Sequence, residues 1–210
     1  MIAPLFNVTA LAMDLAVFVV AFFVGAIPFG VLVSRAFYGT DIRSAGSGNI
    51  GAANALRTLG RRGALAVLAL DALKGLAPVL AAKAVGGTVP AVLAALAAVI
   101  GHCWSPFLGF KGGKGVATFL GAAIGLWWPA GAAFGLVWIA AVIACGYASV
   151  GSMLASLAMA PVLWFGIGRL GFVYGLLAAL IVVYRHRENL ERLRRGTENR
   201  LSFLKAPRQS

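Results

Sequence analysis

The chain has 210 residues, of which 61% are hydrophobic and 11% are charged. A soluble domain of this size carries about a quarter charged residues, so the composition excludes an ordinary soluble protein and indicates an all-α polytopic membrane protein. The net charge is +12, but the basic residues occur in short segments, which argues against nucleic-acid binding. We expect one membrane-embedded domain over residues 1–210, because no stretch is long enough for a separate soluble domain.

Seven apolar segments follow one another along the chain, and each predicts a transmembrane helix. The first, near 11–35, contains Asp14 and lacks a basic leader, so it is predicted to be a span and not a cleaved signal. As one helix, the run from 116 to 149 would be roughly 50 Å long, more than a bilayer needs. Trp127, Trp128 and Pro129 therefore predict an interfacial turn between two spans. The remaining spans are expected near 63–83, 89–104, 151–167 and 170–184.

Basic residues are distributed unequally between the two sides that seven spans would create. One side carries only Lys83 and Arg169. The other carries Arg35, Arg43, Arg57, Arg61, Arg62, Lys111, Lys114 and the eight basic residues from Arg185 to Arg208. The positive-inside rule then predicts an external N-terminus and a cytoplasmic C-terminus. All the polar, glycine-rich segments fall on the cytoplasmic side.

The first polar segment is "DIRSAGSGNIGAANALRTLGRRG", residues 41–63. Its glycines expose backbone N–H groups, and Ser47, Asn49 and Asn54 add neutral hydrogen-bonding groups. Arg57 lies where a helix is expected to begin, and a guanidinium can bind a phosphate through two parallel hydrogen bonds. The segment indicates an anion-binding loop; a flexible basic loop is the alternative.

The second polar segment is "FLGFKGGKGVATFLG", residues 107–121. Gly112, Gly113 and Gly115 around Lys114 are typical of a phosphate-binding loop that leads into a helix. The segment is not a Walker A motif, because Gly115 stands where a magnesium-binding Ser or Thr is required. The alternative is an interfacial turn with lysines that extend to the membrane surface.

The third polar segment is "YRHRENLERLRRGTENR", residues 184–200, in which His186 and Asn189 share a face if the helix continues. A basic tail that binds acidic lipid is the alternative. Within the second span, Asp71 and Lys74 form a candidate charge pair with either a functional or a structural role. Ser149 lies at the cytoplasmic end of the fifth span, where serine usually packs or bonds to helix backbone. His102 is more often structural in such a setting.

The three polar segments together resemble the bacterial acyl-phosphate:glycerol-3-phosphate acyltransferases of the inner membrane. The family patterns GSGNxGATNxxR, GHxxSPFxxFKGGKGVAT and RHxxNxxRLxxGxE stand here as "GSGNIGAANALR", "GHCWSPFLGFKGGKGVAT" and "RHRENLERLRRGTE". The resemblance covers almost the whole chain. It implies seven spans and transfer of a fatty acyl group from acyl phosphate to the sn-1 hydroxyl of glycerol 3-phosphate, which gives lysophosphatidic acid and phosphate.

The resemblance also implies the residues of the site. The catalytic or substrate-binding positions of the family match Ser47, Arg57, Lys114, Ser149, His186 and Asn189, with Gly48, Asn49, Asn54, Gly112, Gly113 and Gly115 as further substrate-binding residues. The glycine segment with Lys114 is assigned to the acyl phosphate, and Arg57, Lys114, His186 and Asn189 to glycerol 3-phosphate. Either His186 or the donor phosphate takes the hydroxyl proton. Ala53 stands where the family often has Thr, and "ASVGS" around Ser149 departs from the family pattern.

These expectations include no cofactor and no metal ion, and they describe a monomer in the bacterial inner membrane whose partners are its two substrates and membrane lipid. Two other functions are alternatives to acyl transfer. An organophosphate transporter or anion channel predicts internal repeats and polar residues on both sides, neither of which the sequence shows. A CDP-alcohol phosphotransferase needs several clustered aspartates for metal ions, whereas Asp14, Asp41 and Asp71 are widely separated.

Overall fold

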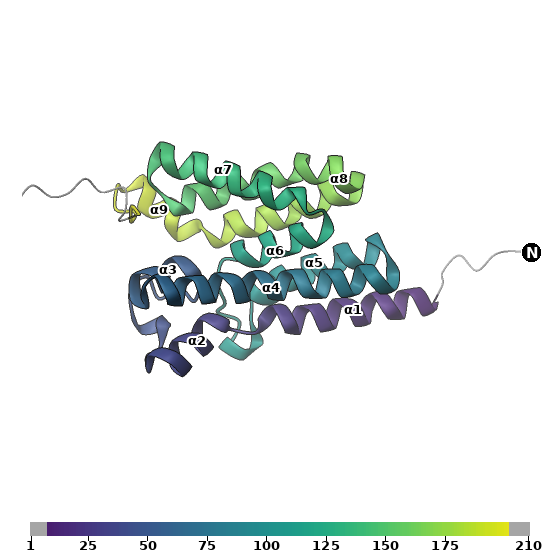
Figure 1. Ribbon diagram of the computed structural model, residues 1–210, viewed down its shortest axis with the longest axis horizontal. Helices are drawn as coiled ribbons and strands as arrows, with labels where there is room; N and C mark the ends of the chain where they lie inside the picture. The colour runs from purple at the N-terminus through teal and green to yellow at the C-terminus, as the bar shows by residue number, and fades with distance from the viewer. Residues whose placement is uncertain (1–7, 202–210) are drawn as a thin grey trace, which may run out of the picture.

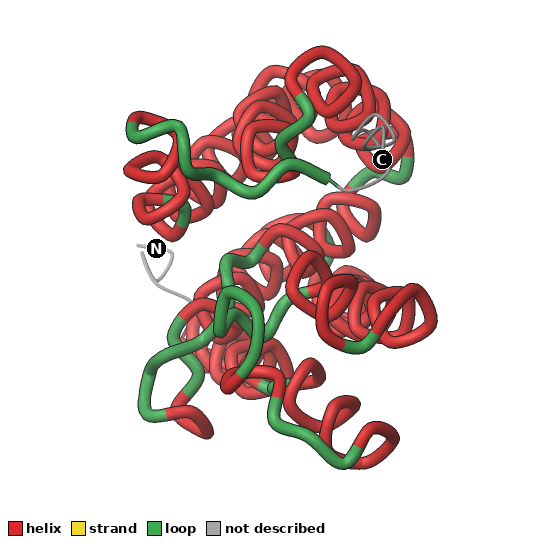
Figure 2. Tube along the Cα trace, turned by 90° about the vertical axis from the view of Figure 1, so that its left-hand side faces the viewer, coloured by secondary structure: helices red, strands yellow, loops and turns green. Residues whose placement is uncertain are grey.

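The computed structural model describes residues 8–201, and no strand occurs within that range (Figures 1 and 2). Lys205 and Arg208 of the basic tail, and the first seven residues, lie outside the described part. Two short 3-10 turns, Ile42–Ser44 and Pro106–Leu108, interrupt the loops. The α-helices are α1 (Val8–Ala26), α2 (Phe29–Tyr38), α3 (Ala52–Thr58), α4 (Gly60–Gly86), α5 (Thr88–Cys103), α6 (Val116–Leu126), α7 (Pro129–Cys145), α8 (Ala148–Arg185) and α9 (Arg187–Arg194).

Four helical stretches in residues 8–201 are long and apolar enough to cross a bilayer: Val8–Tyr38, Gly60–Gly86, Thr88–Leu108 and Ala148–Arg185. The helices α6 and α7 are apolar but shorter. The predicted break between them is confirmed, because α6 ends at Leu126 and α7 begins at Pro129. Pro129 stands in the first turn of α7, where its missing N–H leaves no intrahelical bond unmade.

The long helix α8 contains the turn predicted between the last two apolar segments. Ile167 and Gly168 leave the helical conformation, and Gly168 has a φ of 66°, which glycine adopts without strain. A Cβ on Gly171 would lie 2.3 Å from the carbonyl oxygen of Leu163, and one on Gly175 would lie 2.7 Å from the Cα of Ala160. These contacts show that the two halves of α8 fold back against each other as an antiparallel pair, as Figure 1 also shows.

The first apolar segment differs from the prediction of one continuous span over 11–35. It divides at Pro28, after which α2 leaves the direction of α1 (Figure 1). Proline has no N–H and obstructs the preceding turn, so it frees carbonyl groups at the end of α1. Buried side chains satisfy two of them: the Ser105 hydroxyl donates to the Ala26 oxygen at 2.7 Å, and the Lys74 ammonium donates to the Ile27 oxygen at 2.7 Å.

Pairs of glycines bring neighbouring helices into close contact. Between α1 and α5, a Cβ on Gly25 would lie 2.2 Å from the Ala98 oxygen, and one on Gly101 would lie 2.0 Å from the Phe22 oxygen. Between α4 and α6, a Cβ on Gly75 would clash with the Thr118 oxygen, and a Cβ on Gly121 would clash with the Ala72 oxygen. Small residues that permit backbone contact are typical of helix packing in membranes. These contacts pack α1 closely against α5 and α4 closely against α6.

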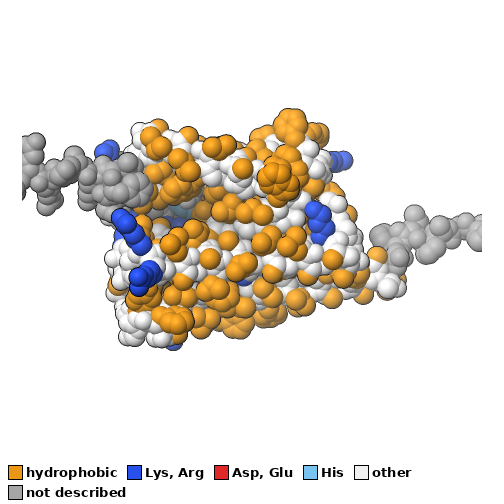
Figure 3. Space-filling model, viewed as in Figure 1, with side chains coloured by type: hydrophobic (Ala, Val, Ile, Leu, Met, Phe, Trp, Pro, Cys, Tyr) orange, Lys and Arg blue, Asp and Glu red, His pale blue; other side chains and the backbone are white. Residues whose placement is uncertain are grey.

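The polar loops gather at one end of the bundle, where α2, α3 and α9 lie (Figure 1). In Figure 3, Lys and Arg side chains appear mainly at the two ends, and apolar side chains cover most of the flank between them. At the opposite end, Lys83 donates to the Leu126 oxygen at 3.0 Å and Gly166 packs on the Trp127 ring. The fold therefore collects the three polar sequence segments at one end.

Candidate active site

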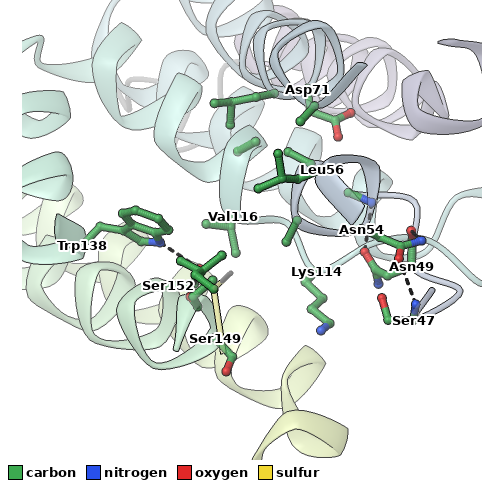
Figure 4. A pocket seen from close by; sticks show the side chains of 18 of the residues that line it. Ser47, Asn49, Asn54, Leu56, Asp71, Lys114, Val116, Trp138, Ser149 and Ser152 are labelled. Atoms are coloured by element: carbon green, nitrogen blue, oxygen red, sulfur yellow. Dashed lines mark hydrogen bonds between the residues drawn. The ribbon is translucent and has the colours of Figure 1, made fainter. Parts of the chain in front are cut away.

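A cavity of about 640 Å³ lies between α3, α4 and α6 on one side and α7, α8 and α9 on the other. Figure 3 shows the hollow on the surface, and Figure 4 shows its lining from close by. Every one of the three polar segments contributes to it. Among the residues predicted from the sequence, it is lined by Ser47, Asn49, Asn54, Arg57, Lys114, Gly115, Ser149, His186 and Asn189.

A smaller cavity of about 200 Å³ adjoins the large one and shares Ser47, Asn49 and Lys114 with it. The predicted residues Gly48 and Gly112 line this smaller cavity. Its other charged lining residues are Lys111, Arg185, Arg187 and Glu188. Of all the predicted site residues, Gly113 alone lines neither cavity.

The loop of the first polar segment is built around the buried side chain of Asn54. Its Oδ1 accepts a hydrogen bond from the Ser47 N–H at 2.8 Å, and its Nδ2 donates to the carbonyl oxygens of Ile42, Ala45 and Asn49 at 2.9–3.1 Å. Both ends of the amide are therefore occupied within the loop. Asn54 shapes the anion loop and positions Ser47, which is a different role from the substrate contact that the sequence predicted.

Ser47 and Arg57 present unoccupied polar groups to the large cavity. Among residues 8–201, neither the Ser47 hydroxyl nor the Arg57 guanidinium makes a hydrogen bond to the protein, and both residues are exposed. Arg57 stands in the last turn of the short helix α3. Because its five N–H donors form a planar fork, it is suited to bind a phosphate at this position.

The glycine segment is fixed between α5 and α8. The Gly113 N–H donates to the His102 carbonyl oxygen at 3.1 Å, so it is not available to a phosphate, contrary to the sequence-based prediction. The Arg185 guanidinium donates to the Gly112 oxygen at 2.7 Å and to the Gly113 oxygen at 3.0 Å. Gly115 has a φ of 83° and begins α6. The backbone thereby directs the Lys114 side chain into the cavity (Figure 4).

Lys114 is mostly buried, and its ammonium donates a hydrogen bond to Oδ1 of Asn189 on α9. Burial, and then the nearby Arg192, lowers the pKa of Lys114 from 10.5 to about 8. Lys114 is thus a desolvated cation that an anionic ligand would stabilise. The contact joins the second and third polar segments across 75 positions of sequence.

Glu198 forms the centre of a hydrogen-bond network that the sequence reasoning missed. Its Oε1 accepts hydrogen bonds from Ser149 at 2.8 Å and from Asn189 at 2.6 Å, and its Oε2 accepts one from Arg192 at 2.7 Å. These three donors hold the pKa of Glu198 below its ordinary value despite the opposing effect of burial. The last position of the RHxxNxxRLxxGxE pattern was the available signal, since it marks this glutamate.

His186 follows the last residue of α8 and is buried beside Lys114. Its Nδ1 lies 2.8 Å from the Val182 oxygen, which favours the tautomer with the proton on Nδ1 and leaves Nε2 as an acceptor. Burial, and then the charge of Lys114, lowers the pKa of His186 from 6.5 to about 4. At neutral pH the ring is therefore uncharged.

Comparisons with known proteins agree with this arrangement. The model of the family described as glycerol-3-phosphate acyltransferase matches residues 15–196. The chain is 44% identical over 189 residues to the glycerol-3-phosphate acyltransferase of Bradyrhizobium sp. strain BTAi1, covering 89% of this chain and 94% of that protein. It is 48% identical over 185 residues to that of Geobacter sulfurreducens, covering 86% and 94%. The chain belongs to the glycerol-3-phosphate acyltransferase family.

Solved structures of the family share the fold. The crystal structure of PlsY, an integral membrane glycerol 3-phosphate acyltransferase, in its glycerol 3-phosphate form has a TM-score of 0.85 and 35% identity, covering 91% of this chain and 96% of that chain. Its lysophosphatidic acid form has a TM-score of 0.84 and 34% identity, with the same coverage. Membership of this family excludes the two alternative functions, an organophosphate transporter or anion channel and a CDP-alcohol phosphotransferase.

Most of the remaining lining of the large cavity is apolar, although Arg61, Asp71 and His102 also line it. Leu65 and Leu68 of α4, Leu120 of α6, and Phe134 and Ile139 of α7 line it away from the cationic end. Trp138 closes one side and donates to the Ser152 hydroxyl at 3.2 Å. The cavity therefore combines a cationic, hydrogen-bonding end with an apolar groove between the helices. No group of three His, Cys, Asp or Glu residues suited to a metal ion occurs within the described range.

Proposed function

We propose that the protein transfers a fatty acyl group from a long-chain acyl phosphate to the sn-1 hydroxyl of glycerol 3-phosphate. The observation that carries this proposal is the continuity of the apolar groove with the cationic end that holds Arg57 and Lys114. The groove suits an acyl chain, and the cations suit phosphate. The glycerol 3-phosphate and lysophosphatidic acid forms of the PlsY crystal structure support the same acceptor and product here.

Arg57, Lys114 and Asn189 are the groups proposed to bind glycerol 3-phosphate, together with the neutral His186. The loop that contains Ser47, Gly48 and Asn49 would face the phosphate of the donor, together with Gly112, Lys114 and Gly115. Lys114 lines both cavities, so it lies where it can contact either phosphate. Two separate phosphates explain why three polar segments converge on one site.

An acyl phosphate donor is compatible with a site that offers no activated nucleophile. The Ser149 hydroxyl donates to Glu198, and Nδ1 of His186 bonds to a backbone carbonyl and not to a carboxylate. The described residues thus contain no Ser-His-Asp arrangement of the kind that forms an acyl-enzyme. A mixed anhydride already carries a good leaving group, so positioning and charge stabilisation can supply the acceleration.

In the proposed step, the sn-1 oxygen attacks the acyl carbonyl carbon and the bond between that carbon and the phosphate oxygen breaks. The phosphate leaves with the bonding electrons, while Arg57 and Lys114 stabilise the negative charge. The low pKa of His186 makes it a weak base. We therefore assign the hydroxyl proton to the departing phosphate, which leaves as a strongly basic trianion and becomes hydrogen phosphate when it takes the proton. Nε2 of His186 accepts the hydroxyl's hydrogen bond and orients it.

Variants of His186 test this assignment. His186→Gln, whose side-chain oxygen can still accept a hydrogen bond, should retain kcat within about tenfold of wild type, whereas His186→Ala should lose about 100-fold or more. The measurement is kcat at saturating concentrations of both substrates. Equal and large losses in both variants would show that the imidazole itself takes the proton.

The donor is tested with purified protein and either palmitoyl phosphate or palmitoyl-CoA as the acyl source. We expect lysophosphatidic acid acylated at the sn-1 position with palmitoyl phosphate and no product with palmitoyl-CoA. If the protein used palmitoyl-CoA efficiently and did not use palmitoyl phosphate, the proposed donor would be wrong, whereas the proposed acceptor would still stand. A heat-inactivated sample measures the uncatalysed transfer from acyl phosphate.

The proposed setting is the bacterial inner membrane, with seven spans, an external N-terminus and the site on the cytoplasmic side. The structure supports this by supplying seven apolar helical segments, counting α1, the two halves of α8, and α4 to α7. The basic end of the bundle carries the site, as the positive-inside rule requires of a cytoplasmic face.

A further inference from the structure

We propose that His102 is a positioning residue for Lys114, and that it acts by supporting the backbone of Gly112 and Gly113 from beneath. The proposal rests on the proposed function, since it assumes that Lys114 binds a phosphate of the reaction. His102 itself lies in the last turn of α5 and is 3% exposed. It precedes Lys114 by one short loop, contacts that loop and Asp71 of α4, and lines the large cavity.

The glycine segment lies directly on His102. The Gly113 N–H donates to the His102 carbonyl oxygen at 3.1 Å. A Cβ on Gly113 would lie 2.2 Å from Nε2 of the His102 ring, and a Cβ on Gly112 would lie 2.0 Å from the His102 carbonyl oxygen. Gly113 and Gly112 therefore leave no room for a Cβ. At Gly113 the Cβ would clash with the His102 side chain, and at Gly112 it would clash with the His102 backbone.

The ring of His102 is held in turn by buried charges of α4. Its Nδ1 lies 3.7 Å from Oδ1 of Asp71, too far for a hydrogen bond, so the carboxylate acts on the ring as a nearby charge. The same Oδ1 lies 2.7 Å from the Lys74 ammonium, which also donates to the Ile27 oxygen at the break after α1. All three side chains are 3% exposed or less, and Nδ1 of the ring has no hydrogen-bond partner among the described residues, so packing and the nearby charge hold the ring in place.

Arg185 holds the glycine segment from the other side. Its two hydrogen bonds to the Gly112 and Gly113 oxygens come from the end of α8, and its guanidinium lies 5.6 Å from the Trp104 ring centre. Lys114 follows the clamped peptide directly and reaches Asn189. A displacement of about 1 Å in such a positioning element can cost on the order of 100-fold in rate. The clamp thus explains how a glycine-rich backbone holds a catalytic cation in one place.

A second-site rescue tests the proposal. Gly113→Ala should lose about 100-fold in kcat/KM because its Cβ meets the His102 ring, and His102→Ala alone should lose about tenfold. In the double variant the missing ring leaves space for the Cβ, so its kcat/KM should return to within about threefold of His102→Ala. His102→Ser provides a second background that also clears the space.

Gly112→Ala is the matched control, because its Cβ meets the backbone oxygen of His102, which remains after substitution. His102→Ala should therefore not rescue it. A second readout is the labelling rate of Lys114 by an amine reagent as a function of pH, followed on its peptide by mass spectrometry. The apparent pKa should be about 8 in wild type, rise toward that of a free lysine in Gly113→Ala, and return in the double variant.

The proposal is overturned if Gly113→Ala is fully active, if removal of the ring does not rescue it, or if removal rescues Gly112→Ala equally. Thermal unfolding midpoints of the purified variants separate displacement of the loop from loss of the fold. Failure of the proposed function is distinguishable, because it would appear as an inactive wild type, whereas the labelling profiles of Lys114 would still report the position of the loop.

Discussion

Replacing Lys114 with alanine should reduce kcat/KM by about 10³-fold, the upper end of the loss that follows removal of one charge-stabilising donor. Lys114 is the only residue of the glycine segment that extends a charge into both cavities. The variant also leaves Oδ1 of Asn189 without its donor. The measurement is the initial rate of lysophosphatidic acid formation with each substrate varied in turn.

Arg62→Ala is the matched control, since Arg62 is exposed and lines neither cavity. It should stay within about threefold of wild type, as surface substitutions usually do. A lysine loses its charge above its pKa, so kcat/KM of the wild type should fall as the pH rises through about 8. Lys114→Ala with wild-type kinetics would remove Lys114 from the site.

Replacing Glu198 with alanine should disable the enzyme without touching a phosphate-binding cation. The change leaves Ser149, Asn189 and Arg192 without their common acceptor, in a place where the Glu198 side chain is 4% exposed. Unsatisfied buried groups cost about 1–3 kcal/mol each. We expect a loss of stability of roughly 3 kcal/mol and a fall in kcat of about 100-fold, because Asn189 and Lys114 lose their alignment.

The control is Glu191→Ala, which removes an exposed ion pair to Arg195 four residues along the same helix. Exposed pairs contribute about 0–1 kcal/mol, so this variant should unfold at nearly the wild-type temperature and retain activity. Circular dichroism during heating measures the loss of stability, and the initial rate measures the loss of activity. If Glu198→Ala matched Glu191→Ala in both, the network around Glu198 would have no role in the site.

Much of the fold was predictable because the length of each apolar run, which predicts a membrane-spanning helix, can be read directly from the sequence. The turn at Trp127–Pro129 and the division of the last apolar region follow directly from residues with strong backbone preferences. Pro28 carried the same kind of signal: it divides the helix predicted over 11–35, although Val8–Tyr38 is still one candidate span by length and composition. Whether the carbonyls freed by Pro28 could be satisfied depended on Lys74 and Ser105, which come from other helices.

The sequence predicted residues that the fold brings together around the two cavities, but it did not predict their contacts within the protein. Asn54 and Gly113 were predicted to contact substrate, and the structure engages the Asn54 side chain and the Gly113 N–H within the protein. The third sequence pattern marked the position of Glu198, but its role was missed because its partner Ser149 lies 49 positions away in the sequence. Such hydrogen-bond partners are set by tertiary contacts that sequence spacing does not encode.

The central claim is that this protein uses acyl phosphate and its own residues alone to acylate glycerol 3-phosphate. The most direct measurement supplies the purified protein with palmitoyl phosphate and labelled glycerol 3-phosphate, without added metal or coenzyme A, and quantifies both products. We predict lysophosphatidic acid and inorganic phosphate in equal amounts. Phosphate release without lysophosphatidic acid, or no reaction of either substrate, would contradict the claim.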